Sequence, residues 1–254
     1  MNRRERRRAK RNSGQKRQRV SARTDVRASD IDGLMAEASR LYEAGDVRGA
    51  QSSFELIIAI NPAHADALFG LGVLVEQDGD LITAKQHYRA AIESTPGHAP
   101  SLVNLGNILH SERKYPEAIE LLERAANEAQ DVPLVHNNFG IALHHSGRTE
   151  DAISVFQKAL ELDPQFVEAS CNLGAVFADL DRFEEAIECF ERALEHSPDN
   201  SAVLANLGNA LNGANRIEEA ISALERAIES DPSNAFAYAK LATLNERLNH
   251  LDKA

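Results

Sequence analysis

Histidine and cysteine are the residues of this chain best suited to bind a metal ion or to act as a nucleophile. The sequence has nine histidines and two cysteines, Cys171 and Cys189. His144 and His145 are adjacent and should diverge on a helix. His110 and His144 are 34 residues apart, and we expect them to lie near each other. Such a pair does not complete a zinc site without a nearby cysteine or carboxylate cluster. The chain also lacks the phosphate-loop, nucleophile-elbow and metalloprotease motifs. We therefore expect no metal, no cofactor and no catalytic residue, and at most a mild pH sensitivity from the histidines.

A row of asparagines offers a different chemistry, which is the binding of a peptide backbone. The row consists of Asn104, Asn138, Asn172 and Asn206, spaced by 34 residues. An asparagine amide both donates and accepts hydrogen bonds, so such a row can hold an extended peptide whatever its side chains are. The alternative is that each amide bonds to the neighbouring structural unit and serves packing alone. The sequence leaves both interpretations open.

The interval of 34 residues recurs along the chain from residue 31 onward. An alanine recurs at Ala50, Ala84, Ala118, Ala152, Ala186, Ala220 and Ala254. A small residue precedes each alanine, at Ala38, Gly72, Gly106, Gly140, Gly174, Gly208 and Ala242. A bulky residue follows it, at Phe54, Tyr88, Leu122, Phe156, Phe190 and Leu224. A proline recurs at Pro62, Pro96, Pro164, Pro198 and Pro232, and Gln130 takes its place once. Such self-similarity at a fixed period is typical of a repeat array.

Each period contains two amphipathic helices joined by a turn. In one period, Leu204 and Leu211 share a face of the first helix, and Ile217 and Leu224 share a face of the second. The small residue and the alanine should let the two backbones approach, the bulky residue should fill the gap beyond them, and the proline should end the second helix. Residues that tolerate a left-handed backbone lie between the helices, at Gly45, Gly79, Gly147, Asp181, Asn215 and Asn249, and Arg113 breaks this row.

These rows resemble the tetratricopeptide repeat (TPR) family over residues 31–254. The resemblance implies an all-α fold, a right-handed superhelical solenoid of antiparallel two-helix repeats whose first helices line a concave groove. Six full repeats are predicted at 31–64, 65–98, 99–132, 133–166, 167–200 and 201–234, with a partial seventh at 235–254. The chain ends just inside the second helix of that last repeat. We therefore expect an apolar face without its partner helix, formed by Tyr238, Leu241, Leu244, Leu248 and Leu251. A truncated gene product, a frayed terminus, or an oligomer formed through this open repeat would each account for it.

The asparagine row occupies the sixth position of four successive repeats, whereas the fourth, seventh and eleventh positions are apolar. Given the geometry that the resemblance implies, we expect the asparagine side chains to point into the groove. Further groove residues on this prediction are Asn107, Asn137, Asn209, His110 and His144. The row is similar to one in the repeat domain of O-linked N-acetylglucosamine transferases. Another groove chemistry of the family, a Lys, Arg and Asn clamp for a C-terminal carboxylate, lacks its cations, since Val103 and Ala205 stand where a base is expected.

The net charge of −11 combines a basic segment with an acidic body. Residues 1–30 contain twelve Arg or Lys and three acids, whereas the rest contains sixteen basic and thirty-six acidic residues. Because residues 1–30 contain almost no apolar side chains, we expect them to form a disordered tail. The tail either binds nucleic acid or anionic lipid electrostatically or folds back weakly onto the acidic repeats. We favour the second interpretation, because no aromatic residues are interleaved for base stacking.

The function predicted from the sequence is a protein-interaction scaffold that holds an extended peptide in its groove. One alternative is the substrate-recruiting part of a larger transferase, of the O-linked N-acetylglucosamine type or a methyltransferase, and the opening residues also look like the start of some bacterial proteins of that kind. Another alternative is an adaptor that associates with nucleic acid through its tail. The chain has no apolar stretch long enough to span a membrane, no signal peptide and no disulfide framework, so we expect a cytoplasmic protein.

Overall fold

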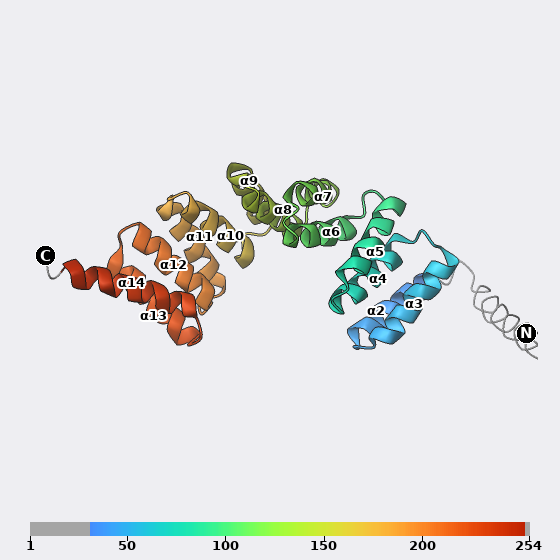
Figure 1. The fold of residues 1–254 in the computed structure, drawn as a ribbon, viewed down its shortest axis with the longest axis horizontal. Coiled ribbons are helices and arrows are strands. Elements are labelled where there is room, and N and C mark those ends of the chain that lie inside the picture. Colours follow the sequence, from blue (N-terminus) through green and yellow to red (C-terminus); the bar gives the residue numbers. More distant parts are fainter. Residues whose placement is uncertain (1–30, 252–254) are drawn as a thin grey trace, which may run out of the picture. The chain divides into compact units, whose positions relative to one another are not determined.

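The computed structural model describes residues 31–251, with side chains as far as Arg247. The expectations for residues 1–30 and for Leu248, Leu251 and Ala254 lie outside this description. Within it, every regular element is an α-helix, which confirms the predicted all-α array of helical repeats. The helices are α2 (Ile31–Glu43), α3 (Val47–Ile60), α4 (Ala65–Gln77), α5 (Leu81–Ser94), α6 (Ala99–Ser111), α7 (Tyr115–Glu128), α8 (Pro133–His145), α9 (Thr149–Leu162), α10 (Val167–Asp179), α11 (Phe183–His196), α12 (Ser201–Gly213), α13 (Ile217–Ser230) and α14 (Ala235–Leu251) (Figure 1).

The helices form two compact units, of which the first ends at Ile108 and the second begins at Leu109. In unit 1, α2 packs on α3 and α4 packs on α5. In unit 2, the pairs are α8 with α9, α10 with α11, and α12 with α13, and α14 packs on both α12 and α13. Each pair is an antiparallel hairpin, since a short turn joins its two helices. None of the described helices is long and apolar enough to cross a membrane.

In the hairpins that begin with α4, α8, α10 and α12, the contact between the two helices differs in one respect from the expectation. The small residue of the first helix lies closer to the bulky side chain of the second helix than to the backbone of that helix. A Cβ atom added at Gly174 would lie 2.8 Å from a ring carbon of Phe190, and one added at Gly140 would lie 2.7 Å from the ring of Phe156. The small residue therefore makes room for the ring that fills the hairpin, and the row of bulky residues depends on it.

The turns between the helices adopt the left-handed conformation that their sequence predicts. Gly45, Gly79, Gly147, Asp181 and Asn215 all have positive φ. Arg113 is not a residue type that favours this conformation, yet its φ is 60° and its turn has the same left-handed backbone as the others. A side chain with a Cβ atom is disfavoured in this region, at about 1–2 kcal/mol, so the neighbouring repeats impose the conformation on Arg113.

Replacing Arg113 with glycine should therefore raise the free energy of unfolding by roughly 0.5–1 kcal/mol, because glycine adopts this backbone conformation without steric cost. The measurement is urea denaturation followed by circular dichroism. The matched control is Gly147→Ala, which introduces a Cβ atom at φ of 86° and should destabilise the fold. A loss of stability in Arg113→Gly would show that the Arg113 side chain makes a contact more favourable than the relief of backbone strain.

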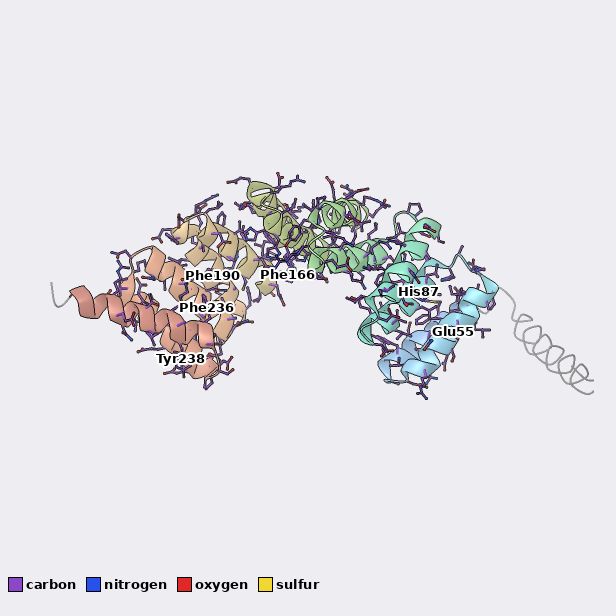
Figure 2. The ribbon with its side chains drawn as sticks, viewed as in Figure 1. Glu55, His87, Phe166, Phe190, Phe236 and Tyr238 are labelled. Carbon is purple, nitrogen blue, oxygen red and sulfur yellow. The ribbon has the colours of Figure 1, made fainter. Side chains whose placement is uncertain are left out.

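The structure of the last helix, α14, contradicts two expectations, one about the turn at Asn249 and one about the exposure of Leu244. Asn249 was predicted at a helix end but lies inside α14, which continues to Leu251. Leu244, predicted to lack a partner helix, is only 2% exposed, because α12 and α13 cover that side of α14. Tyr238 is exposed as expected, and Phe236 is exposed beside it (Figure 2). The part of the face nearest the preceding repeat is therefore buried.

Candidate peptide-binding surface

Two members of the asparagine row make hydrogen bonds that connect successive repeats. In unit 1, the Asn104 amide donates to the Tyr88 hydroxyl over 3.1 Å. In unit 2, the Asn172 amide donates to Oδ1 of Asn137 over 2.9 Å, and Asn137 is itself buried. Asn104 and Asn172 therefore take part in the packing between repeats, while both side chains remain partly exposed.

The other two members of the row, Asn138 and Asn206, differ from these in their hydrogen bonding. Both are half-buried on first helices of unit 2, and no side-chain hydrogen bond is recorded for either one among residues 31–247. Asn209 is half-buried on α12, and Asn107 is exposed on α6 in unit 1. The predicted groove residues are divided between the two units. Asn104 and Asn107 belong to unit 1, and the remaining predicted residues belong to unit 2.

A second set of polar contacts joins the C-terminal ends of consecutive first helices. In unit 2, ring nitrogens of His110 and His145 are 2.7 Å apart, and Nε2 of His144 lies 3.1 Å from a carboxylate oxygen of Asp179. These contacts share one spacing of 35 residues, as does the bond from Asn172 to Asn137. The set comprises Tyr42 with Gln77, His110 with His145, His144 with Asp179, and Asn212 with Arg247.

Sequence reasoning missed these partners because the repeat rows align residues 34 apart. The signal that would have found them is a polar residue at the twelfth position of one repeat followed by another at the thirteenth position of the next. The equivalent pair between α10 and α12 is Ala178 and Gly213, which cannot form such a contact. The side chains at this end of the first helices thus bind one another in most of the repeats that the structure describes.

The histidines require a correction. His110 was expected near His144, but its ring stacks on His145, with ring centroids 4.9 Å apart and planes inclined by 12°. His144 instead contacts Asp179, and Tyr115 lies against both stacked histidines. In the described residues, no three His, Cys, Asp or Glu side chains are placed to hold a metal ion together.

The stacked pair predicts a pH dependence of stability. Burial lowers the pKa of His110 below its ordinary value of 6.5, and the neighbouring His145 lowers it further. As the pH falls below about 6.5, the unfolded chain therefore takes up the proton before the folded protein does, and stability present at higher pH is lost. We expect the free energy of unfolding to decrease between pH 7.5 and pH 5.5, and to decrease less in His110→Gln.

Urea denaturation at several pH values measures this effect. Burial also lowers the pKa of His87 on α5 (Figure 2), so some slope should remain in the variant. Identical slopes in the wild type and His110→Gln would contradict a role for the stacked pair.

The cysteines do not form an activated nucleophile. Cys189 is buried on α11 and Cys171 is half-buried on α10, and both are free thiols. Burial raises the pKa of each thiol to about 11. Because the thiolate is the reactive form, neither cysteine is prepared for catalysis at neutral pH.

Comparison with known proteins identifies the family. A family model described as the cilia and flagella-associated protein 70 C-terminal domain matches residues 17–254. No curated protein matches the chain. Among solved structures, Pseudomonas aeruginosa pilF is 19% identical with a TM-score of 0.73, covering 85% of this chain and 98% of that one.

Two further structures show the same fold. YrrB, described as a TPR protein with an unusual peptide-binding site, is 23% identical with a TM-score of 0.62, covering 73% of this chain and 96% of that one. MamA from Desulfovibrio magneticus RS-1 is 26% identical with a TM-score of 0.55, covering 59% and 85%. The resemblance to O-linked N-acetylglucosamine transferases stays a prediction. Since the family model spans nearly the whole chain, this protein is a TPR protein that belongs to the family of the cilia and flagella-associated protein 70 C-terminal domain.

Proposed function

We propose that the chain binds an extended segment of a partner protein on the first helices of unit 2, with asparagine side chains holding the peptide backbone. TPR-like proteins are protein-interaction scaffolds, and a fold alone does not choose the partner. The observation that carries the proposal is the state of Asn138 and Asn206. Both amides are partly accessible and are not used by the described packing, so they can donate to a peptide carbonyl and accept from a peptide N–H.

The states of the cysteine and histidine side chains support binding and not catalysis as the function. The two thiols are protonated at neutral pH, because burial raises the pKa of both to about 11. His110, His144 and His145 are engaged with one another, with Asp179 and with Tyr115. Free thiols suit a reducing compartment, and we propose the cytoplasm as the location.

The test uses the full chain and peptides selected from a random library against it. Asn138→Ala combined with Asn206→Ala should weaken the selected peptides about tenfold or more, since each amide contributes roughly 0.5–1.5 kcal/mol per hydrogen bond. The matched control is Asn127→Ala, an exposed asparagine on the second helix α7. Affinity is measured by fluorescence anisotropy, and circular dichroism verifies the helix content.

Asn172→Ala serves as a second comparison. It removes the donor to buried Asn137, so it should cost about 1–3 kcal/mol of stability. Selected peptides that bind the Asn138/Asn206 variant as tightly as the wild type would contradict the proposed contact of these side chains with the peptide.

A further inference from the structure

We propose that unit 1 has a pocket of its own, which receives one aliphatic side chain from a segment of a separate protein with a cation on each side of that residue. The inference rests on the proposed function in one respect, namely that the ligand is a protein. It concerns a different unit and a different chemistry, because the asparagines of unit 2 recognise backbone whereas this pocket selects side chains.

The pocket is a cavity of about 360 Å³ between α2, α3 and α4. The apolar part of its lining comes from Met35, Phe54, Phe69, Val73 and Leu74. Protein ligand pockets range over roughly 300–1,000 Å³, so this one is at the small end. A pocket at the small end of this range suits a side chain and not a larger ligand.

Gly70 explains why the pocket is apolar. Gly70 occupies the position at which the following repeat has Asn104, so the asparagine row is absent from this repeat. A Cβ atom at Gly70 would lie 2.5 Å from the ring of Phe54. The ring of Phe54 therefore closes the pocket at the place where a polar side chain would otherwise stand.

The rim of the pocket is acidic. Its lining includes Glu43 and Asp66 and contains no lysine or arginine. Glu43 is the last residue of α2, where the negative end of the helix adds to its charge and favours a cation. Of the basic residues described in unit 1, only Arg40 lies on a first helix, and it is bound to Glu37 at 2.7 Å.

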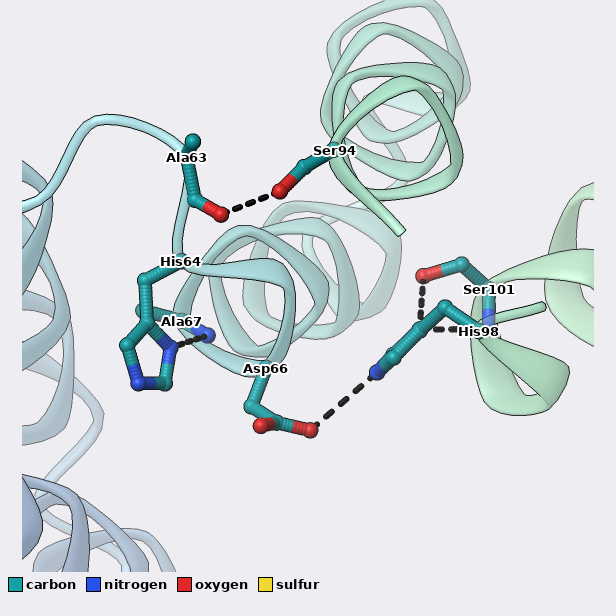
Figure 3. A network of polar contacts seen from close by, with 7 residues as sticks. All are labelled: Ala63, His64, Asp66, Ala67, Ser94, His98 and Ser101. Atoms are coloured by element: carbon teal, nitrogen blue, oxygen red, sulfur yellow. Dashed lines mark hydrogen bonds and ion pairs between the residues drawn. The ribbon is translucent and has the colours of Figure 1, made fainter. Parts of the chain in front are cut away.

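The Asp66 carboxylate is accessible to a cation of the ligand. Oδ1 of Asp66 lies 3.1 Å from Nε2 of His98, and Nδ1 of His98 lies 2.8 Å from the hydroxyl of Ser101 (Figure 3). The Asp66 side chain is nevertheless 65% exposed, so its carboxylate oxygens can accept from a further partner.

The two acids lie at opposite ends of the pocket. The Gln77 amide donates to the Tyr42 hydroxyl, which places the C-terminal ends of α2 and α4 together, whereas Asp66 lies in the first turn of α4. The rise of about 1.5 Å per residue from Asp66 to the end of α4 places the two acids roughly 16 Å apart along the helix axis. An extended chain covers that distance in about five residues.

This arrangement fits a segment in which an aliphatic residue lies between two cations about five residues apart, and Lys-x-Leu-x-x-Arg is one example. A fatty acid, a phospholipid or a nucleic acid would bring negative charge against Glu43 and Asp66, and is disfavoured for that reason.

The experiment measures the affinity of the full chain for a fluorescent dodecapeptide that contains Lys-Ala-Leu-Ser-Ala-Arg. Ser39→Phe fills the pocket from an exposed position on α2 without removing a core side chain, and should weaken binding at least tenfold. Replacing the leucine of the probe with alanine should have a similar effect. Glu43→Gln combined with Asp66→Asn should weaken binding roughly threefold to tenfold and reduce its salt dependence. Glu55→Gln, on the second helix α3 (Figure 2), is the matched control and should leave the affinity unchanged.

Four results would overturn the proposal, and the last of them leaves the proposed function standing. The first is equal affinity of the wild type and the charge variant, which keeps the test valid even if Ser39→Phe misfolds. The second is equal affinity for a probe with glutamates in place of Lys and Arg. The third is tighter probe binding after Arg17, Arg19 and Arg23 are changed to Glu, which would assign the pocket to the basic segment of this same chain. Loss of probe binding in the Asn138/Asn206 variant alone would locate the ligand in unit 2, which contradicts the pocket but leaves the proposed function standing.

Discussion

Replacing Phe190 with alanine should lower the free energy of unfolding by about 3–5 kcal/mol, the usual cost of deleting a buried aromatic ring. Phe190 is 1% exposed and its ring lies against Gly174 of the partner helix. Because a glycine faces the ring, no neighbouring side chain at that position can move in to fill the cavity. The measurement is urea denaturation of unit 2 in the full chain, followed by circular dichroism.

Phe236→Ala is the control for this prediction. Phe236 is 44% exposed on α14, so its loss should cost less than about 1 kcal/mol. Stability in a repeat array is approximately a sum of repeats and their interfaces, and the effect of Phe190→Ala should therefore be concentrated in α10, α11 and their immediate neighbours. Hydrogen exchange resolves this distribution, and equal losses in the two variants would contradict the role given to the hairpin ring.

Replacing Gly174 with valine should destabilise the same hairpin by about 1–3 kcal/mol through overpacking. The added Cβ atom would lie 2.8 Å from a ring carbon of Phe190, closer than two carbon atoms can approach without movement. Valine has a somewhat higher helix propensity than glycine, so any measured loss comes from packing and not from the helix itself.

Gly33→Val provides the matched control, because nothing lies within 4 Å of a Cβ atom at Gly33 on α2. The same chemical change there should be neutral or slightly stabilising. In a double-mutant cycle, Gly174→Val combined with Phe190→Ala should cost less than the sum of the two single changes, since the valine partly fills the cavity that the ring leaves. Additive losses would show that the clash in Gly174→Val is with another part of the hairpin.

These packing predictions also constrain the interpretation of binding experiments. The first helices present the proposed contact residues Asn138 and Asn206 on α8 and α12, and the hairpin rings hold those helices in place. A variant that loses a ring will weaken binding by loosening the surface. The asparagine and pocket variants are informative because they change side chains that are at least partly exposed and leave the rings intact.

The sequence by itself determined the helices, the repeat and the location of the turns, except for the turn expected at Asn249. These follow from local patterns, since an amphipathic period makes a helix and a residue with positive φ ends it. The fixed spacing of small and bulky residues likewise predicted a close contact at Gly174. The structure shows that Gly174 faces the ring of Phe190 and not the backbone of the second helix.

Only the tertiary structure decided which polar side chains meet. His110 contacts His145, and Asn172 bonds to Asn137, each across 35 residues. A row of equivalent positions cannot show this, because the stacking of one repeat on the next shifts the contact by one residue relative to the repeat period. The pocket at Gly70 was invisible for a related reason, since its floor is the ring of Phe54 on α3 and its rim joins the end of α2 to the start of α4. Sequence periodicity defines what each repeat contains, and packing between repeats defines what each side chain touches.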